Sequence, residues 1–214
     1  MNDTTKQTDV WSSDFGQQYT DRNPHSPQDM DVLYARQFGI SRTALNQEFL
    51  GDMDRTLRIL EVGANVGTQL QALQDLGFKN LYGIELQAYA VEQAKKYTKG
   101  INLIQGTAFD LPFRDGWFDV VYTSGVLIHI SPDHIKQALA EILRCSRRYV
   151  WGFEYFEETY TSIPYRGRDD LLWKTDFAHL YQTVNTHLRL VKERKIPYVG
   201  SSNVDQMYLL EKQV

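Results

Sequence analysis

The sequence predicts an α/β domain built on an open, mostly parallel sheet with helices on both faces. Short apolar runs alternate along the chain with helical patterns. The first run, 59–62, leads into a glycine turn at 63–67 and then a helix, which is typical of a nucleoside-binding sheet. A length of 214 residues suits one such domain, and the 42% hydrophobic fraction supplies its core. We place the domain at 51–214, preceded by a helical flap or cap at 1–50.

The elements that follow the turn alternate in type. Leu70, Leu73 and Leu76 share one face of a helix that Gly77 ends. The remaining expected elements are strands over 81–84, 101–105, 117–123, 149–153, 188–195 and 204–211, with helices over 88–97, from 131, and over 176–187. The last two strands would form an antiparallel hairpin after five parallel strands, which makes a seven-stranded sheet.

The N-terminal flap is marked by aromatic side chains. Trp11, Phe15 and Tyr19 have the spacing of one helix face, and a second helix is expected over 27–49. Packing onto the domain is the favoured interpretation for Trp11 and Phe15. Tyr19 and Arg22 are instead expected to close over a cofactor, since an arginine pairs well with a carboxylate. The polar residues 1–9 are expected to be disordered.

The glycine turn has residues suited to gripping a ligand. Gly63 lets the backbone turn sharply off the strand, and Gly67 lets the next helix start close to the ligand. Asn65 stands where many such loops carry a glycine, and asparagine tolerates left-handed backbone geometry. Glu85, at the tip of the next strand, is placed to accept hydrogen bonds from two ribose hydroxyls.

Two cofactor classes use a turn of this kind. Dinucleotide folds carry Gly-x-Gly-x-x-Gly, so that a helix N-terminus faces a pyrophosphate. Here the middle glycine is missing, and Glu61 would repel a pyrophosphate but suits an amino-bearing ligand. The stretch 57–86 resembles the first two motifs of class I S-adenosylmethionine-dependent methyltransferases. The resemblance implies a Rossmann-like fold with S-adenosyl-L-methionine as cofactor and S-adenosyl-L-homocysteine as product, and we favour it over a nicotinamide enzyme.

A third segment, 106–113, resembles the element that holds the adenine in the same enzymes. Thr107 stands where that pattern has an acid, so its hydroxyl, or Asp110 instead, would accept from the adenine amino group, while the Ala108 N–H would donate to the ring. The expected cofactor-binding residues are Tyr19, Arg22, Glu61, Gly63, Asn65, Gly67, Glu85, Leu86, Thr107, Ala108 and Ser124.

Three residues are candidates for catalysis. His129 follows the fourth parallel strand, at the edge of the sheet where ligands bind. It either orients its loop or contacts the methionine portion of the cofactor, or it acts as a general base or a ligand of the acceptor, because histidine titrates near neutrality. Glu154 and Asp169 are the other candidates, with Glu154 equally suited to holding a lid in place.

Residues 154–178 are polar and aromatic and follow a strand tip, so they are expected to form a lid over the acceptor. This segment, with 126–133, resembles the pseudaminic acid biosynthesis-associated methylases. That family has Glu-Tyr-Tyr or similar, Tyr-Arg-Gly-x-x-Asp and Lys-x-Asp-Phe-Ala, which correspond here to 154–156, 165–170 and 174–178. The resemblance implies carbohydrate biosynthesis and an acidic or nucleotide sugar as the small-molecule acceptor.

Three lid residues are expected to shape the acceptor site: Tyr155, Tyr165 and Arg166. An arginine among tyrosines suits a carboxylate or phosphate. An ion pair between Arg166 and Asp169 or Asp170, which would shape the lid itself, is an equal alternative.

Composition narrows the function. A net charge of −4 gives no basic face for nucleic acid, and the single cysteine excludes an internal disulfide or a cysteine-rich metal site. The sequence shows neither a signal peptide nor an apolar run of membrane-spanning length, so a cytoplasmic enzyme without a membrane partner is expected. Two alternatives remain: a methyltransferase for a protein or other acceptor, and a non-catalytic cofactor-binding protein.

Overall fold

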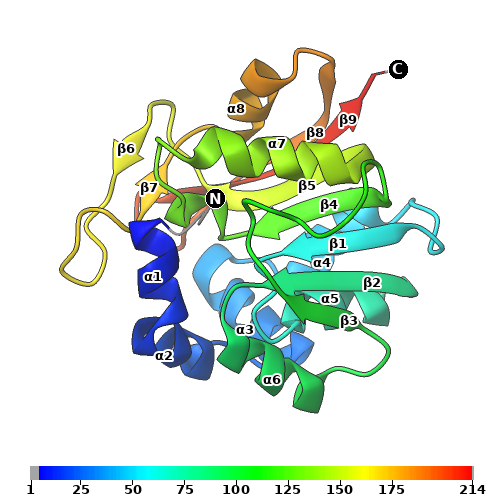
Figure 1. Ribbon diagram of the computed structural model, residues 1–214, viewed down its shortest axis with the longest axis horizontal. Coiled ribbons are helices and arrows are strands. Elements are labelled where there is room, and N and C mark those ends of the chain that lie inside the picture. The colour runs from blue at the N-terminus through cyan, green and yellow to red at the C-terminus, as the bar shows by residue number, and fades with distance from the viewer. Residues whose placement is uncertain (1–4, 214) are drawn as a thin grey trace.

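The centre of the molecule is a seven-stranded sheet with the strand order β3-β2-β1-β4-β5-β9-β8 (Figure 1). The computed structural model describes residues 5–213. The first five strands are parallel, and β9 is antiparallel to both of its neighbours, as expected from the sequence. The strands are β1 (Arg58–Val62), β2 (Asn80–Glu85), β3 (Asn102–Gln105), β4 (Phe118–Ser124), β5 (Ser146–Tyr155), β8 (Leu188–Pro197) and β9 (Val204–Lys212).

Helices cover both faces of the sheet (Figure 1). One apolar cluster packs α7 and α8 against β4, β5 and β9, and a second packs α4 and α5 against the opposite face. The helices are α1 (Lys6–Ser12), α2 (Asp14–Arg22), α3 (Pro27–Phe38), α4 (Arg42–Leu50), α5 (Thr68–Asp75), α6 (Ala88–Tyr97), α7 (Ile135–Cys145) and α8 (Phe177–Val184), with a short 3₁₀ turn, η1 (Leu127–His129). The described helices include none with the length and apolarity needed to cross a bilayer.

The strand order places several chain segments at one edge of the sheet. It reverses between β1 and β4, and a crevice forms at such a reversal outside the carboxyl ends of the strands. Because β9 runs antiparallel to β5, its first residues lie at the same edge as the end of β5, and Asp205 pairs with Tyr155. The β8–β9 turn therefore contributes to the same crevice as the glycine turn that follows β1.

The N-terminal helices differ from the expected ones in where they break. Residues 6–9 are helical rather than disordered, whereas 1–4 lie outside the described residues. Ser13 separates α1 from α2 and caps α2 by accepting a hydrogen bond from the Phe15 N–H. The helix expected over 27–49 is two helices, because Gly39 takes a left-handed conformation with φ of 71° and ends α3.

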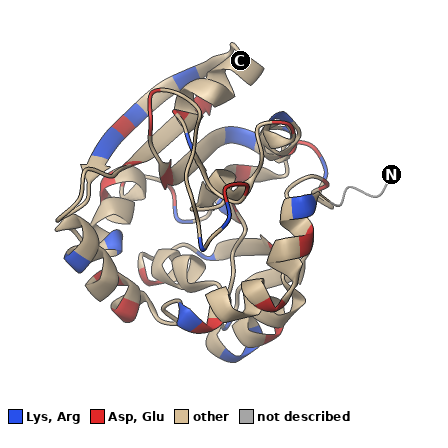
Figure 2. Cartoon of the chain, turned by 90° about the vertical axis from the view of Figure 1, so that its left-hand side faces the viewer, with Lys and Arg blue, Asp and Glu red and all other residues tan. Residues whose placement is uncertain are grey.

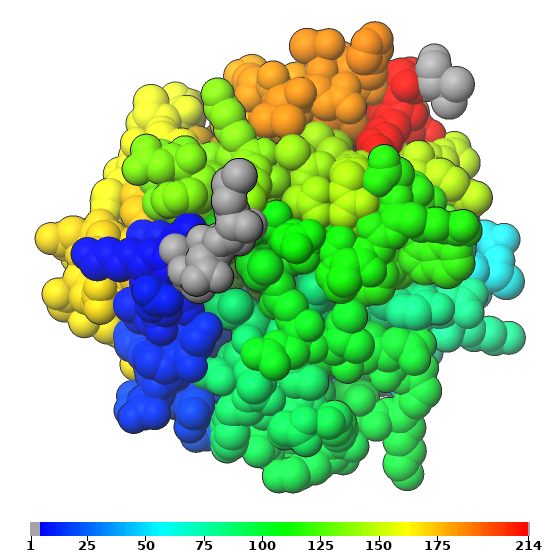
Figure 3. All heavy atoms as spheres, viewed as in Figure 1, coloured from blue at the N-terminus to red at the C-terminus, as the bar shows by residue number. Residues whose placement is uncertain are grey.

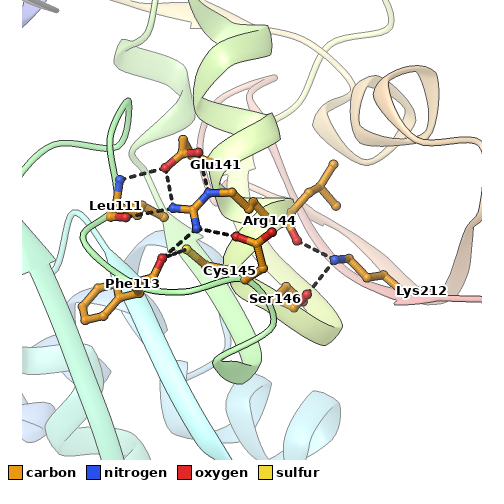
Figure 4. Close-up of polar contacts among 9 residues, drawn as sticks. Leu111, Phe113, Glu141, Arg144, Cys145, Ser146 and Lys212 are labelled. Atoms are coloured by element: carbon orange, nitrogen blue, oxygen red, sulfur yellow. Dashed lines mark hydrogen bonds and ion pairs between the residues drawn. The ribbon is translucent and has the colours of Figure 1, made fainter.

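The loop that connects β3 to β4 is fastened to α7 by Arg144 (Figure 4). Its guanidinium donates to the carbonyl oxygens of Leu111 and Phe113 at 2.8 and 2.6 Å, and it pairs with Glu141. Glu141 also accepts from the Leu111 N–H at 2.9 Å. These bonds fix the loop whose first residues form part of the crevice.

The helix expected from residue 131 begins only at Ile135.

The flap and the lid meet on the crevice side of the sheet. The lid carries a small two-stranded ribbon of β6 (Thr161–Ser162) and β7 (Trp173–Lys174). Lys6 forms an ion pair with Asp170, and the Gln7 side-chain amide donates to the Asp170 carbonyl at 3.1 Å. The blue N-terminal helix therefore lies against the yellow lid (Figure 3).

Candidate active site

A cavity of about 410 Å³ lies at the carboxyl edge of the sheet, between the flap and the lid, and is partly open to solvent. Figure 2 faces this side of the molecule and shows charged residues of both signs scattered over the surrounding helices. We divide the cavity into two parts by their lining. The turn half is lined by Glu61, Gly63, Asn65, Glu85, Leu86, Thr107 and Ala108, and the aromatic half by Tyr34, Gln37, Phe38, Phe153, Tyr155, Tyr198 and Asp205.

The glycine turn has the expected backbone conformation. Gly63 and Asn65 both adopt positive φ angles, of 78° and 47°. The Gly63 N–H donates to the Ile84 carbonyl at 2.8 Å, which ties the turn to the end of β2. Gly67 is placed differently from our expectation, because it does not line the cavity. It has a φ of 78°, and a Cβ there would lie 2.9 Å from Thr98 Cγ2, so it is needed for the turn and for contact with the end of α6.

Glu85 is held in a fixed position at the tip of β2. One carboxylate oxygen accepts from the Gln87 N–H and the other from the Asn65 N–H, both at 2.8 Å. Burial raises the pKa of Glu85 above its usual value. Each oxygen retains a further lone pair, so the carboxylate can accept hydrogen bonds from a diol while it stays anchored.

Two buried polar atoms of the turn half lack a hydrogen-bond partner among residues 5–213. They are Asn65 Oδ1 and Glu61 Oε2; the buried Tyr122 hydroxyl lies close enough to the Glu61 carboxyl to influence its pKa but makes no hydrogen bond of standard geometry with it. Glu61 is 2% exposed, and burial raises the pKa of its carboxyl to about 8. Unpaired buried acceptors are unfavourable, and a ligand that brings N–H or O–H donors would satisfy them. The turn half therefore fits an amino- and hydroxyl-bearing cofactor such as S-adenosylmethionine.

Thr107 and Ala108 line the turn half at the end of β3, where an adenine is expected. The Thr107 hydroxyl accepts from the Phe109 N–H at 3.3 Å, and Thr107 bridges to Asp110 through the backbone. Asp110 is exposed and does not line the cavity, so it is not the substitute acceptor that we considered. The bridge forms a tight turn that directs Asp110 to solvent.

Helices α1 and α2 of the flap contribute two aromatic side chains to the cavity. Tyr19 lines it, and burial raises the pKa of its phenol to about 12. Trp11 also lines it and contacts Tyr19 with ring centroids 5.1 Å apart, a position that our packing interpretation missed. Arg22 is exposed at the last turn of α2 and does not line the cavity, so its pairing with a cofactor carboxylate stays a prediction that this geometry does not support.

His129 ends η1 and lines the cavity beneath the flap. Its Nδ1 lies 2.7 Å from the Leu171 carbonyl oxygen, which can only accept, so Nδ1 carries the proton. Burial lowers the pKa of the imidazole to about 4, so the ring is neutral at pH 7. Nε2 is then a hydrogen-bond acceptor. The Trp11 ring packs over the imidazole at a centroid distance of 4.4 Å.

The two other candidate catalytic acids have different surroundings. Glu154 lines the cavity and is 1% exposed, and it accepts from the backbone N–H groups of Val126 and Ile128 at 3.0 and 3.4 Å. Burial raises the pKa of Glu154 to about 7. These bonds hold the loop that carries His129, which favours a positioning role. Asp169 is exposed in the lid and does not line the cavity, so the structure does not support our expectation that it is catalytic.

The lid residues are divided between the cavity and solvent. Tyr155 and Tyr165 line the cavity as expected. Arg166 is exposed, at a φ of 53° in a tight turn, and its guanidinium lies 5.8 Å from the Phe15 ring centroid. Neither expected role of Arg166 appears in the structure, because Arg168 is the residue that pairs with Asp170, at 3.2 Å.

Apart from Tyr155, the aromatic half was not predicted from the sequence. Phe38 links its rings, with centroids 5.1 Å from Tyr34, 5.6 Å from Phe153 and 4.7 Å from Tyr198. These residues come from α3, β5 and the β8–β9 turn, and only the strand order brings them together. The one local signal is Asp205, an acid among apolar residues at the start of a strand.

A buried cation lies behind this wall. Arg42 is 0% exposed, and its Nη1 donates to the Tyr34 and Ser124 hydroxyls, each at 3.1 Å. Within the described part of the chain, no carboxylate lies within 4 Å of its guanidinium. With a lone pair occupied by Arg42, the Ser124 and Tyr34 hydroxyls are left to donate into the cavity.

Comparison with known proteins supports the domain class. Residues 60–149 match the methyltransferase domain family. The demethylmenaquinone methyltransferase of Beutenbergia cavernae is 30% identical over 141 residues, which cover 59% of this chain and 56% of that protein. The chain spans only about a third to just over half of the length of the curated relatives it matches.

Two solved methyltransferases share the fold over nearly the whole chain. The Burkholderia thailandensis 1,6-didemethyltoxoflavin-N1-methyltransferase, solved with 1,6-didemethyltoxoflavin and S-adenosylhomocysteine, has a TM-score of 0.70 and 17% identity, covering 96% of this chain and 88% of its own. The Synechocystis magnesium protoporphyrin IX methyltransferase, solved with S-adenosylmethionine, has a TM-score of 0.68 and 13% identity, covering all of both chains. The fold is the Rossmann-like fold of class I methyltransferases, and residues 60–149 are similar to the methyltransferase domain family.

Proposed function

We propose that this protein is an S-adenosylmethionine-dependent methyltransferase that acts on a small molecule and releases S-adenosylhomocysteine. The observation that carries the proposal is the anchored Glu85 carboxylate, which faces a cavity that also contains the unpartnered Glu61 and Asn65 oxygens. A ribose diol and an amino group satisfy these acceptors together. The two structural neighbours described above, solved with this cofactor or its product, support the same assignment.

The partial enclosure of the cavity supports a small-molecule acceptor. The flap contacts the lid through the Gln7–Asp170 hydrogen bond and the Phe15–Tyr165 ring pair, so both segments narrow the approach to the cavity. The names of the relatives point the same way, since they specify menaquinone, sterol and toxoflavin precursors as acceptors.

The chain positions the acceptor and handles its proton. The bound cofactor supplies an electrophilic methyl group on a sulfonium. In-line alignment of the acceptor is then the main requirement, and the Ser124 and Tyr34 hydroxyls, fixed by Arg42, are placed to orient it. His129 Nε2 is the group that would accept the proton that the acceptor atom loses, and its low pKa of about 4 confines this role to a proton that becomes strongly acidic as the methyl bond forms. Glu154 holds the loop that carries His129.

The acidic or nucleotide sugar expected from the lid motifs depended on Arg166. With Arg166 at the surface, the structural support that remains for a sugar is the aromatic wall, because aromatic rings pack well against apolar sugar faces. The sugar class stays a prediction from resemblance, and the acidic group has no cationic side chain lining the cavity to receive it.

The test of this function is calorimetric titration of S-adenosylmethionine and S-adenosylhomocysteine into the protein and its Glu85→Ala variant. A hydrogen bond to a charged group contributes about 1.5–3 kcal/mol, so we expect Glu85→Ala to weaken binding by at least about tenfold. The matched control is Glu92→Ala, which removes an exposed glutamate that pairs with Lys95 on α6. If the folded wild-type protein binds neither ligand, or if Glu85→Ala binds as tightly as Glu92→Ala, the cofactor assignment must be withdrawn.

Turnover separates an enzyme from a protein that only binds the cofactor. Methyl uptake from labelled S-adenosylmethionine, screened over small hydroxyl- and amine-bearing molecules, is expected to give product that Glu85→Ala does not. Tight cofactor binding without uptake by any small acceptor would instead favour a protein acceptor or a non-catalytic role.

A further inference from the structure

Within residues 5–213, the Asp, Glu, Lys and Arg side chains that line the cavity are all acidic. Among the described residues, four carboxylates line it, from Glu61, Glu85, Glu154 and Asp205, whereas no lysine or arginine does. Glu85 and Glu154 are occupied by backbone N–H groups. Glu61 belongs to the turn half, and its Oε2 is buried without a partner. Asp205 is the carboxylate of the aromatic half, and the proposed cofactor chemistry does not use it.

Asp205 is poorly paired for a buried carboxylate. It is 2% exposed, and its only side-chain partner in the described chain is the Tyr198 hydroxyl, at long distances of 3.3 and 3.4 Å. The neighbouring cations are engaged elsewhere, since Lys174 donates to Asn203 at 2.5 Å and Arg42 donates to hydroxyls. Burial raises the pKa of Asp205 to about 8. The free acid is therefore largely protonated at pH 7, and a ligand cation that binds here would displace that proton and leave a carboxylate as its counter-charge.

The rings around Asp205 suit the same kind of ligand. Tyr155 contacts Tyr198 with centroids 5.8 Å apart, and Tyr198 continues through Phe38 to Tyr34 and Phe153. The faces of aromatic rings carry negative potential and attract organic cations. Arg42 already lies over the rings of Tyr34 and Phe153, and Lys174 over that of Tyr155. The rings of Phe38 and Tyr198, beside Asp205, are therefore the ones complementary to a nitrogen cation on an apolar skeleton.

We propose that the aromatic half binds the acceptor through a basic nitrogen, so that the substrate is a small organic amine whose N–H or ammonium group contacts Asp205 beside the rings of Phe38 and Tyr198. This inference rests on the proposed function and specifies its substrate class. An acceptor with a carboxylate or phosphate at this position would face Asp205 without a cationic partner in the cavity wall. Arg42 does not supply one, because it lies behind the Tyr34 and Ser124 hydroxyls to which it donates.

The test uses three probes of matched shape: phenethylamine, 2-phenylethanol and 3-phenylpropanoate. Each is titrated at pH 7 into the full chain saturated with S-adenosylhomocysteine, and binding is measured by calorimetry. The amine is expected to bind at least about tenfold more tightly than the alcohol, and the carboxylate least tightly. This comparison needs no variant, so it stands even if a substitution impairs folding.

Two variants locate the effect. Asp205→Asn removes the charge with little change of shape and is expected to weaken amine binding at least about tenfold. Asp169→Asn makes the same chemical change in the exposed part of the lid and should leave amine binding unchanged. Melting curves followed by circular dichroism confirm that both variants fold.

The outcomes distinguish the two proposals. If the carboxylate probe binds as tightly as the amine, if Asp205→Asn leaves amine binding intact, or if no probe binds to protein that holds S-adenosylhomocysteine, the amine inference is overturned and the methyltransferase proposal stands. If S-adenosylhomocysteine itself fails to bind, the proposed function has failed first.

Discussion

Replacing Gly63 by alanine is expected to destabilise the protein through two separable effects. Gly63 has a φ of 78°, and a Cβ at this position would lie 2.4 Å from Val126 Cγ2. An L-residue in the left-handed region costs about 1–2 kcal/mol. Overpacking against a neighbour adds about 1–3 kcal/mol. The total of about 2–5 kcal/mol, at about 2–4 °C per kcal/mol for a chain of this size, lowers the melting temperature by about 10 °C.

Gly200→Ala is the matched control for this prediction. Gly200 has a φ of 89°, but a Cβ there would meet nothing within 4 Å. Gly200→Ala shares with Gly63→Ala the unfavourable left-handed backbone conformation and the reduced conformational entropy of the unfolded chain, but it makes no contact with Val126. We therefore expect Gly200→Ala to lower the melting temperature by only about 5 °C.

The assay is thermal and urea unfolding of the cofactor-free protein, followed by circular dichroism. A double variant, Gly63→Ala with Val126→Ala, removes the methyl groups that the new Cβ would strike and should recover the difference between the two glycine variants. Equal losses at Gly63 and Gly200, or a double variant no more stable than the sum of its parts, would refute the reasoning that the Val126 contact requires a glycine.

Three further predictions concern the cavity. Burial raises the pKa of Glu61 from 4.5 to about 8, so the contribution of Glu61 to stability is complete below about pH 4.5 and is lost as the pH rises through 8. Glu61→Gln should therefore flatten the fall in unfolding free energy between pH 5 and 9. An unchanged slope would contradict this prediction. Trp11→Ala removes ring contacts to His129 and Tyr19, each contributing about 0.5–1.5 kcal/mol, and should speed S-adenosylhomocysteine release about tenfold in stopped-flow fluorescence. Lys6→Ala breaks an exposed ion pair and should have little effect on this rate. With an acceptor in hand, His129→Gln should lower kcat by about 100-fold without changing cofactor affinity, and a changed KM alone would indicate a binding role instead.

Local patterns in the sequence were sufficient to predict the sheet and the turn half of the cavity. The Gly63 and Asn65 turn and the Glu85 strand tip lie within one strand–helix–strand unit, so their relative positions follow from short-range geometry. Errors in the helices arose where a single residue decides the break. Gly39 ends α3 by adopting a left-handed conformation, which is hard to tell in advance from a glycine tolerated inside a helix.

Local sequence patterns could not predict how the aromatic half is assembled, because its residues are distant from one another in the chain. Tyr34 and Asp205 are separated by most of the sequence and meet only because β9 inserts between β5 and β8. The lid shows the opposite difficulty. Arg166 and Asp169 stand in a motif with Tyr165, but the tight turn directs their side chains to solvent and only Tyr165 into the cavity.

The two halves of the cavity also have different origins along the chain, with a consequence for engineering the acceptor site. The lining of the turn half falls within the segment 60–149 that matches the methyltransferase domain family. The aromatic half comes from α3, the end of β5 and the β8–β9 turn, all outside that segment. On the proposed assignment of the two halves, grafting these three segments would exchange the acceptor site while the cofactor site within 60–149 is left intact.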